Sequence, residues 1–163
     1  MTNKKPLVYG SDGRIQQLQS GDTLQVPTSE VSIFTLTNAN AGSITQCQAV
    51  YITSNDHVDL AKASALGTEK VYGLVFYASI SSSASGSIQT GNVATATTTV
   101  WQAVTDGGGG LTEGVLYFLS DTTAGNITST VPSTTGHYSC PVGFAISTTE
   151  LELHINPYSN ILL

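Results

Sequence analysis

The chain has 163 residues, of which 40% are hydrophobic and only 10% are charged, and its formal net charge at pH 7 is −6. This length suits one domain with a substantial core. The acidic balance argues against general nucleic-acid binding, which needs a cationic face. No apolar run is long enough to span a membrane, and the N-terminus lacks the apolar segment of a secretory signal, so we expect synthesis in the cytoplasm and no membrane partner.

The composition predicts an all-β fold. Ser and Thr supply about a quarter of the residues, and 16 glycines supply turns. Thr favours strands because its branched Cβ fits a pleated surface. Lys, Glu and Arg, which build solvated helix faces, are scarce. The one helix-permissive stretch is residues 58–66, which could form a single turn.

Residues 1–22 are predicted to form an extended arm with one or two short strands, and residues 23–163 a single β-domain. The arm could dock on another protein, or it could be a solvated terminus. Its candidate contact residues are apolar Leu7, Val8 and Ile15 and the one basic cluster of the chain, Lys4, Lys5 and Arg14.

The first half of the domain is predicted to contain strands and a low-complexity loop. "VSIFTLT" (residues 31–37) is predicted to be a strand buried on both faces. "ITQCQAVYIT" and "VDLAKA" form a hairpin, and "VYGLVFYASI" (residues 71–80) is the most apolar strand. "SSSASGS" should lie exposed, because its small polar residues cannot pack a core. "IQTGNVATATTTVWQAV" is predicted to be a hairpin that turns at Gly91 and Asn92.

The second half begins with "TDGGGG" (residues 105–110), which is predicted to be a flexible turn rather than a phosphate-binding loop, because no Lys-Ser/Thr follows it. The strands "GVLYFLS", "NITST", "YSCPVGFAIS" and "LELHI" come next. In the last of these, Leu151 and Leu153 should face inward, and Glu152 and His154 outward. The apolar "ILL" terminus is expected to pack on the barrel or on a neighbouring molecule.

One segment of the sequence occurs twice in similar form. "AVYITS" (residues 49–54) matches "VLYFLS" (residues 115–120) when Tyr51 is aligned with Tyr117, and Gly73 then corresponds to Gly143. Each unit is a hairpin, a connection and a strand with a glycine among large apolar residues. Two such units predict a small antiparallel β-barrel or β-sandwich. The alternative is chance likeness between Ser/Thr-rich strands.

The residues with reactive side chains form no recognisable catalytic or metal-binding motif. Asp56, His57 and Asp59 form the densest polar cluster, but they lie at a hairpin tip, where such residues serve turn geometry. His137 and His154 have no evident partner. We therefore expect no enzyme activity, no catalytic residue, no metal and no cofactor. Cys47 and Cys140 are expected in the core as free thiols rather than as a disulfide. Tyr77 and Trp101 are expected in the core as packed aromatic residues.

The order of these segments resembles a known family. The arm ending in "RIQQLQSGDTLQVP" is followed by "QAVYI…VDLAKA…KVYGLVFYASI", "GGLTEGVLYFLSDTTAGNIT" and "PVGFAISTTELELHI". This resembles structural proteins of tailed-bacteriophage virions, especially head decoration (cement) proteins, over most of residues 14–155. The resemblance implies a non-enzymatic homotrimer on the capsid surface that clamps neighbouring major capsid proteins, with the arm reaching a capsid subunit or an adjacent protomer.

Two other functions remain open from the sequence. The chain could be a tail or tail-fibre β-module for attachment or fibre assembly. It could also be a carbohydrate-binding module or a small hydrolase, since several aromatic residues could stack on sugars.

Overall fold

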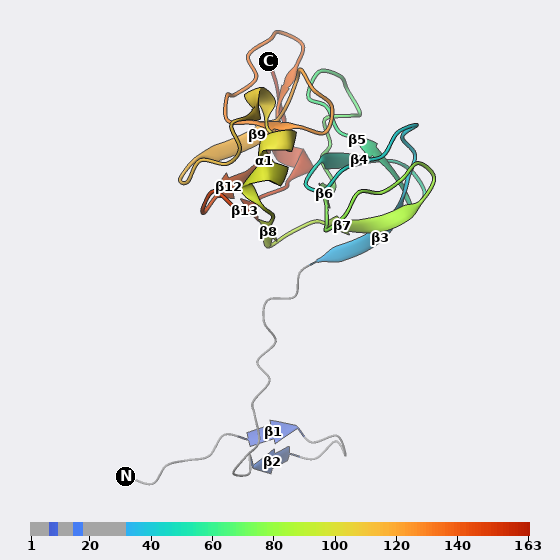
Figure 1. The fold of residues 1–163 in the computed structure, drawn as a ribbon, viewed down its shortest axis with the longest axis vertical. Coiled ribbons are helices and arrows are strands. Elements are labelled where there is room, and N and C mark those ends of the chain that lie inside the picture. Colours follow the sequence, from blue (N-terminus) through green and yellow to red (C-terminus); the bar gives the residue numbers. More distant parts are fainter. Residues whose placement is uncertain (1–6, 10–14, 18–31) are drawn as a thin grey trace. The chain divides into compact units, whose positions relative to one another are not determined.

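The computed structural model describes residues 32–163 in full and residues 7–9 and 15–17 by their backbone (Figure 1). The chain divides into two compact units, Met1–Glu30 and Val31–Leu163. The predicted boundary between residues 22 and 23 lies outside the described residues. In the first unit β1 (Leu7–Tyr9) pairs antiparallel with β2 (Ile15–Gln17).

The first half of the second unit is a closed five-stranded barrel. Its strands follow the order β3-β5-β4-β6-β7, and β7 pairs with β3 to close the ring. All neighbouring strands are antiparallel except β3 and β5, which are parallel. The strands are β3 (Ile33–Asn38), β4 (Ala49–Ser54), β5 (His57–Leu60), β6 (Gly73–Val75) and β7 (Ser85–Gln89).

The second half is an antiparallel five-stranded sheet in the order β10-β9-β12-β13-β8, which confirms the predicted all-β fold. Its strands are β8 (Val93–Thr95), β9 (Leu116–Leu119), β10 (Ile127–Thr128), β12 (Pro141–Ala145) and β13 (Glu150–Leu153). A ribbon of β11 (Tyr138–Ser139) and β14 (Ile161–Leu162) ends the chain. The helical segments are α1 (Thr98–Val104) and the 3₁₀ turns η1 (Asp106–Gly108) and η2 (Pro157–Ser159).

The two halves repeat one topology. The barrel order β5-β4-β6-β7-β3 corresponds strand for strand to β10-β9-β12-β13-β8, so the predicted duplication is present. The register corrects its alignment by one residue. Gly73 lies opposite Val50, and Gly143 lies opposite Tyr117, so Val50 rather than Tyr51 corresponds to Tyr117. A shift of one residue moves a side chain to the other face of a strand. Tyr51 and Tyr117 match in sequence but therefore lie on different faces of their strands.

Helix α1 interrupts the strand of the second repeat that corresponds to β3. In the barrel, Asn38 at the end of β3 pairs in parallel with Val58 of β5. In the second repeat α1 follows β8, and Thr105 just beyond the helix forms a parallel bridge to Ile127 of β10. The helix thus takes part of the place of a closing strand, and its Trp101 is fully buried in the core.

The helix lies outside the helix-permissive stretch, and the predicted hairpin is wrong. Residues 58–66 begin within β5 and continue as turns, whereas the helix lies at Thr98–Val104. The Oγ1 of Thr97 caps this helix by accepting a hydrogen bond from Val100 N at 3.3 Å. Because β7 pairs with β3 and β6, and β8 pairs with β13, the turn at Gly91 joins the two repeats instead of closing a hairpin.

Three further expectations need correction. Ile33 and Phe34 of β3 are exposed, because only Leu36 and the polar end of the strand face the barrel core. Residues 85–87 of the predicted exposed loop belong to β7. The "TDGGGG" segment is held in place by Tyr117, whose hydroxyl donates to Gly110 O at 2.9 Å.

The core has two parts. The smaller fills the barrel, and the larger joins the outer face of the barrel to the inner face of the second sheet, so the two repeats share one packed interface. Figure 1 shows the barrel and the second sheet side by side. The smaller cluster comprises Leu36, Ile44, Val50, Val58, Val75, Ile80 and Ile88. As predicted, Leu151 and Leu153 lie in the larger cluster, and Glu152 and His154 face outward.

Candidate interaction surface

The outer face of the second sheet carries a row of four neighbouring side chains. Leu116 of β9 lies opposite Phe144 of β12, which lies opposite Glu152 of β13, which lies opposite Val93 of β8. Residues directly opposite in antiparallel strands share a face. Leu116 is 39% exposed and Phe144 is 40% exposed, so the apolar members of this row meet solvent. We call these four residues the open row.

The barrel contains the corresponding row in a buried setting. Ala49 of β4, Leu74 of β6, Gln89 of β7 and Ile33 of β3 lie opposite one another in the same order. Ala49 and Leu74 belong to the larger core cluster and are no more than 1% exposed, and Gln89 is 1% exposed. We call these four residues the covered row.

The two rows differ in what lies over them. Apart from Ile33 the covered row is buried, and its Ala49 and Leu74 pack in one core cluster with residues of the second repeat. Within residues 32–163, by contrast, Leu116, Phe144 and Glu152 of the open row are exposed. Ile146, which follows β12, adds a further exposed apolar side chain at 43%. Exposed apolar residues that adjoin on one sheet face mark an interaction surface more reliably than scattered ones. The open row is therefore the candidate functional site.

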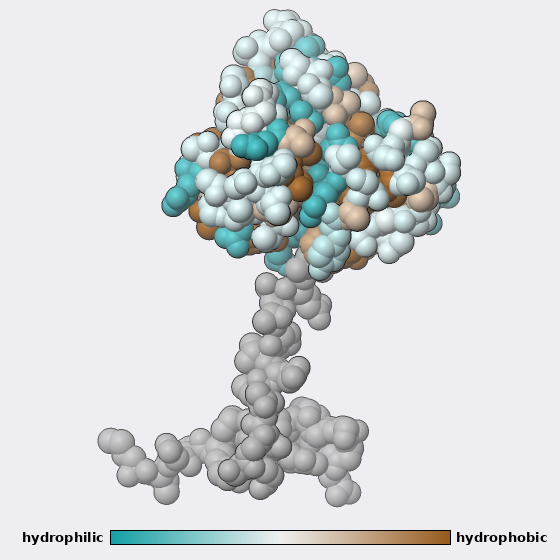
Figure 2. Space-filling view, in the orientation of Figure 1, coloured by the Kyte–Doolittle hydropathy of each residue, from teal (hydrophilic) through white to brown (hydrophobic). Residues whose placement is uncertain are grey.

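Other exposed apolar residues are more dispersed. On the face shown in Figure 2, apolar residues appear in small groups between hydrophilic ones. The terminal "ILL" was expected to pack on the barrel or on a neighbouring molecule. Ile161 and Leu162 are 62% and 61% exposed and so do not pack on the barrel, although β14 pairs with β11. Packing on a neighbouring molecule stays a prediction. Tyr158 in the preceding turn is 97% exposed.

Tyr77 contradicts the expected core position. It is 70% exposed, and its backbone has a φ of 65°, which is rare for an aromatic residue. It borders a groove of about 420 Å³ between the barrel and α1, where Val100 and Ala103 form the helical wall. Trp101, by contrast, is in the core as predicted, and its Nε1 donates to Thr149 O at 3.1 Å.

The carboxylate of Asp106 has a structural role. It accepts hydrogen bonds from the hydroxyls of Ser120 at 2.6 Å and Thr122 at 3.1 Å, and from the amide of Asn126 at 3.2 Å. These contacts tie η1 to the loop between β9 and β10. Asp106 and Asp121 also border a polar hollow of about 380 Å³ lined mainly by Thr and Ser.

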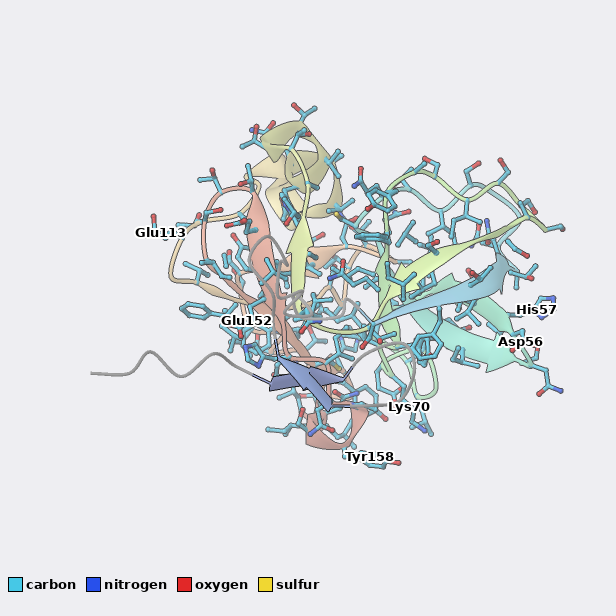
Figure 3. The ribbon with its side chains drawn as sticks, turned by 90° about the horizontal axis from the view of Figure 1, so that it is seen from below. Asp56, His57, Lys70, Glu113, Glu152 and Tyr158 are labelled. Carbon is cyan, nitrogen blue, oxygen red and sulfur yellow. The ribbon has the colours of Figure 1, made fainter. Side chains whose placement is uncertain are left out.

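The residues of the predicted polar cluster form the β4–β5 turn and its local contacts. Asp56 has a φ of 56°, and the Nδ1 of His57 lies 2.6 Å from the carbonyl oxygen of Asn55. Asp59 accepts a hydrogen bond from the side chain of Asn40 at 2.6 Å. In Figure 3 Asp56 and His57 project from the end of the barrel. Within residues 32–163 no three His, Cys, Asp or Glu side chains gather closely enough to hold a metal ion.

The other two histidines have partners that the sequence did not indicate. His137 Nδ1 lies 2.9 Å from Asp121 Oδ2, and His154 Nε2 lies 3.5 Å from Glu152 Oε2. The first pair joins two loops that are 16 residues apart. The second pair joins Glu152, a member of the open row, to the residue that follows β13.

Cys47 and Cys140 are free and buried, as predicted. Burial raises the pKa of the Cys47 thiol from 9.0 to about 12. Burial, followed by the nearby charge of Glu69, raises the pKa of the Cys140 thiol to about 12 as well. Both thiols therefore remain protonated and poorly nucleophilic near neutral pH.

The arm residues proposed as contacts are described only in part. Lys4, Lys5 and Arg14 lie outside the described residues. Leu7, Val8 and Ile15 lie in β1 and β2, and their side chains are outside the described part of the chain.

Comparison of the chain with protein-family models and with curated proteins found no match. The described part of the chain holds no helix with the length and hydropathy needed to cross a bilayer. Sequence reasoning missed the open row because its four members come from four separate segments, and only the strand register brings them together.

Proposed function

We propose that this protein is a non-enzymatic structural protein of a phage virion, which decorates the capsid and stabilises it by clamping neighbouring major capsid proteins. The observation that carries the proposal is the open row. A row that is buried in the barrel has an exposed counterpart in the second repeat, so that, as far as residues 32–163 are concerned, Leu116, Phe144 and the nearby Ile146 are available to an outside partner. Burying exposed apolar side chains is the main source of binding free energy in protein assemblies.

The proposal assigns no catalytic role to the polar residues. His57, His137 and His154 lie on three separate segments, and each contacts a group of its own surroundings. The carboxylate of Asp106 organises a loop, and both thiols are protonated in the fold. These groups act within the structure of a stable β-block, which suits a protein whose role is to cover and hold other subunits.

Binding to isolated capsids tests this role. Capsids from phage that lack this gene product are mixed with the purified protein and sedimented, and the bound protein is counted per particle. We expect saturable binding at hundreds of copies per particle. The variant Phe144→Ser should bind at least tenfold more weakly, because Phe144 is a central apolar member of the open row.

Ile52→Ser is the matched control, since Ile52 is 42% exposed on the barrel strand β4 and lies outside the open row. Equal binding by both variants would refute the role of the open row. Binding to tails at a few dozen copies or fewer would instead support the tail or tail-fibre module.

The arm and the trimer are further parts of the proposal. Deletion of residues 1–22 should abolish capsid binding, while the shortened protein keeps the oligomeric state of the whole chain. Residues 31–163 form a compact unit of their own, so the deletion should leave the domain folded. Sedimentation equilibrium should give the mass of three chains. Full occupancy of capsids by the shortened protein would refute the role of the arm.

A further inference from the structure

We infer that the partner which covers the open row is a basic protein surface, with an apolar centre over Leu116 and Phe144 and a Lys or Arg placed against Glu152. The inference rests on the proposed function in one respect, namely that the natural partner is a virion protein. The charge of the partner follows separately, from a comparison of the two rows.

In the covered row, the polar member is neutral and is satisfied within the chain. The side-chain amide of Gln89 donates to Gly91 O at 2.8 Å and to Val93 O at 3.0 Å. These bonds allow Gln89 to be 1% exposed without loss, because a buried polar group costs free energy unless it is hydrogen-bonded. The covered row therefore needs no charged partner.

In the open row, the same position holds a carboxylate. The side chain of Glu152 is 50% exposed, and its Oε2 lies 3.5 Å from the Nε2 of His154, a contact that is ionic only when the histidine is protonated. A partner that covers Phe144 would also remove water from Glu152, which lies directly opposite it. Desolvating a carboxylate without a cation or several donors is strongly unfavourable. A Lys or Arg on the partner would satisfy this position.

The surroundings favour a basic partner over a second copy of this chain. Glu113 precedes β9 and is exposed, and Glu150 lies on the same strand as Glu152. In Figure 3 Glu113 and Glu152 lie on the side of the view away from Asp56. Residues 31–163 contain eight carboxylate side chains and two lysines, Lys62 and Lys70. Two copies that met through their open rows would bring like charges together, which opposes association.

Designed hairpin peptides test the charge of the partner without a capsid. One peptide presents Leu and Lys on one face, and its counterpart presents Leu and Glu. Each is added to the ¹⁵N-labelled full chain, and amide shifts are followed by NMR. We expect the Leu/Lys hairpin to shift the signals of Leu116, Phe144 and Glu152, and the Leu/Glu hairpin to leave them unchanged at the same concentration.

Two matched variants each remove one negative charge with little change in shape. Glu152→Gln reproduces the residue of the covered row and should weaken Leu/Lys binding about threefold to tenfold. Asp56→Asn lies at the barrel turn, where Asn tolerates the positive φ, and it should leave binding within about twofold. Glu152→Lys should reverse the preference toward the Leu/Glu hairpin.

The inference is overturned if both hairpins bind alike, if the shifts centre on the Asp56 turn, or if Glu152→Lys keeps the wild-type preference. The same variants are then tested on capsids, where Glu152→Lys should bind at least tenfold more weakly and Asp56→Asn normally. If the wild-type chain binds no capsid, the proposed function fails, and the hairpin result alone decides the charge of the partner.

Discussion

Gly73 and Gly143 occupy the same position in the two repeats, and each lies against the backbone of the next strand. A Cβ atom on Gly73 would lie 2.4 Å from the carbonyl oxygen of Gln89, and one on Gly143 would lie 2.4 Å from that of Glu152. Each added atom would also meet the preceding side chain of that strand, Ile88 or Leu151. Close strand approach therefore selects glycine at both positions.

Gly73→Ala and Gly143→Ala should each lower the free energy of unfolding by about 1–3 kcal/mol, because a backbone carbonyl cannot move aside as a flexible side chain can. Urea unfolding followed by circular dichroism measures the change. Gly91→Ala is the control, since a Cβ there would meet nothing within 4 Å, and it should stay within about 0.5 kcal/mol of the parent. A stability of Gly73→Ala equal to that of the control would contradict the close approach.

The sequence was sufficient to predict the inward strand positions, the duplicated unit and the buried thiols, because short-range patterns encode them. Alternation placed Leu151 and Leu153 inward, and the recurrence of a glycine among apolar residues identified the duplicated unit. The buried thiols also followed from the strand-like sequences around them. The inward positions and the thiols depend on residues within a few positions of one another. The duplicated unit depends on comparing two such local patterns.

The features that the sequence did not predict depend on contacts between distant segments. Trp101 lies in a seven-residue helix whose stability comes from burial against the second sheet, and its β-branched neighbours favoured a strand. Tyr77 was expected inside because its strand is apolar, but its left-handed backbone directs it outward. The open row requires the register of four strands, and no local pattern contains that information.

Trp101→Ala should lower the free energy of unfolding by about 3–5 kcal/mol, because it empties the site that α1 fills between the two repeats. Trp101→Phe should cost less, since it keeps most of the packing and removes one of the two hydrogen bonds to Thr149 O, which still accepts from Ala96 N at 3.0 Å. Thr99→Ala, at an exposed position of the same helix, should have little effect. Urea midpoints measure all three, and an Ala variant as stable as the Thr99 control would contradict the role of the helix.

Asp106→Ala should lower the free energy of unfolding by about 1–3 kcal/mol, because the hydroxyl of Ser120, a fully buried residue, loses its acceptor at 2.6 Å and keeps only the contact with Thr122 Oγ1 at 3.1 Å. Asp106→Asn should lie between this variant and the parent, since the amide oxygen still accepts hydrogen bonds. The control is Glu113→Ala, at an exposed position of the segment before β9. Thermal unfolding in matched buffer compares the three, and equal melting temperatures would show that the loop does not depend on this carboxylate.

The buried thiols should make the protein less stable in alkali. The pKa of each thiol is about 12 in the fold, against an ordinary value of 9.0. The contribution of the protonated thiols to the free energy of unfolding is therefore complete below pH 9 and is lost as the pH rises toward 12. The reason is that the thiols of the unfolded chain ionise at a lower pH than those of the fold. Urea midpoints in the presence of a phosphine reductant should fall over this range.

The double variant Cys47→Ala/Cys140→Ala should lose less stability than the parent over the same range. Burial, and then the charge of Asp59, raises the pKa of Tyr51, so its ionisation also lowers the stability at high pH, and Tyr51→Phe separates that contribution.

An aromatic disulfide reagent near pH 8 should label the native thiols far more slowly than the unfolded ones. Equal labelling rates in the native and unfolded protein would contradict the protection that burial gives these two residues.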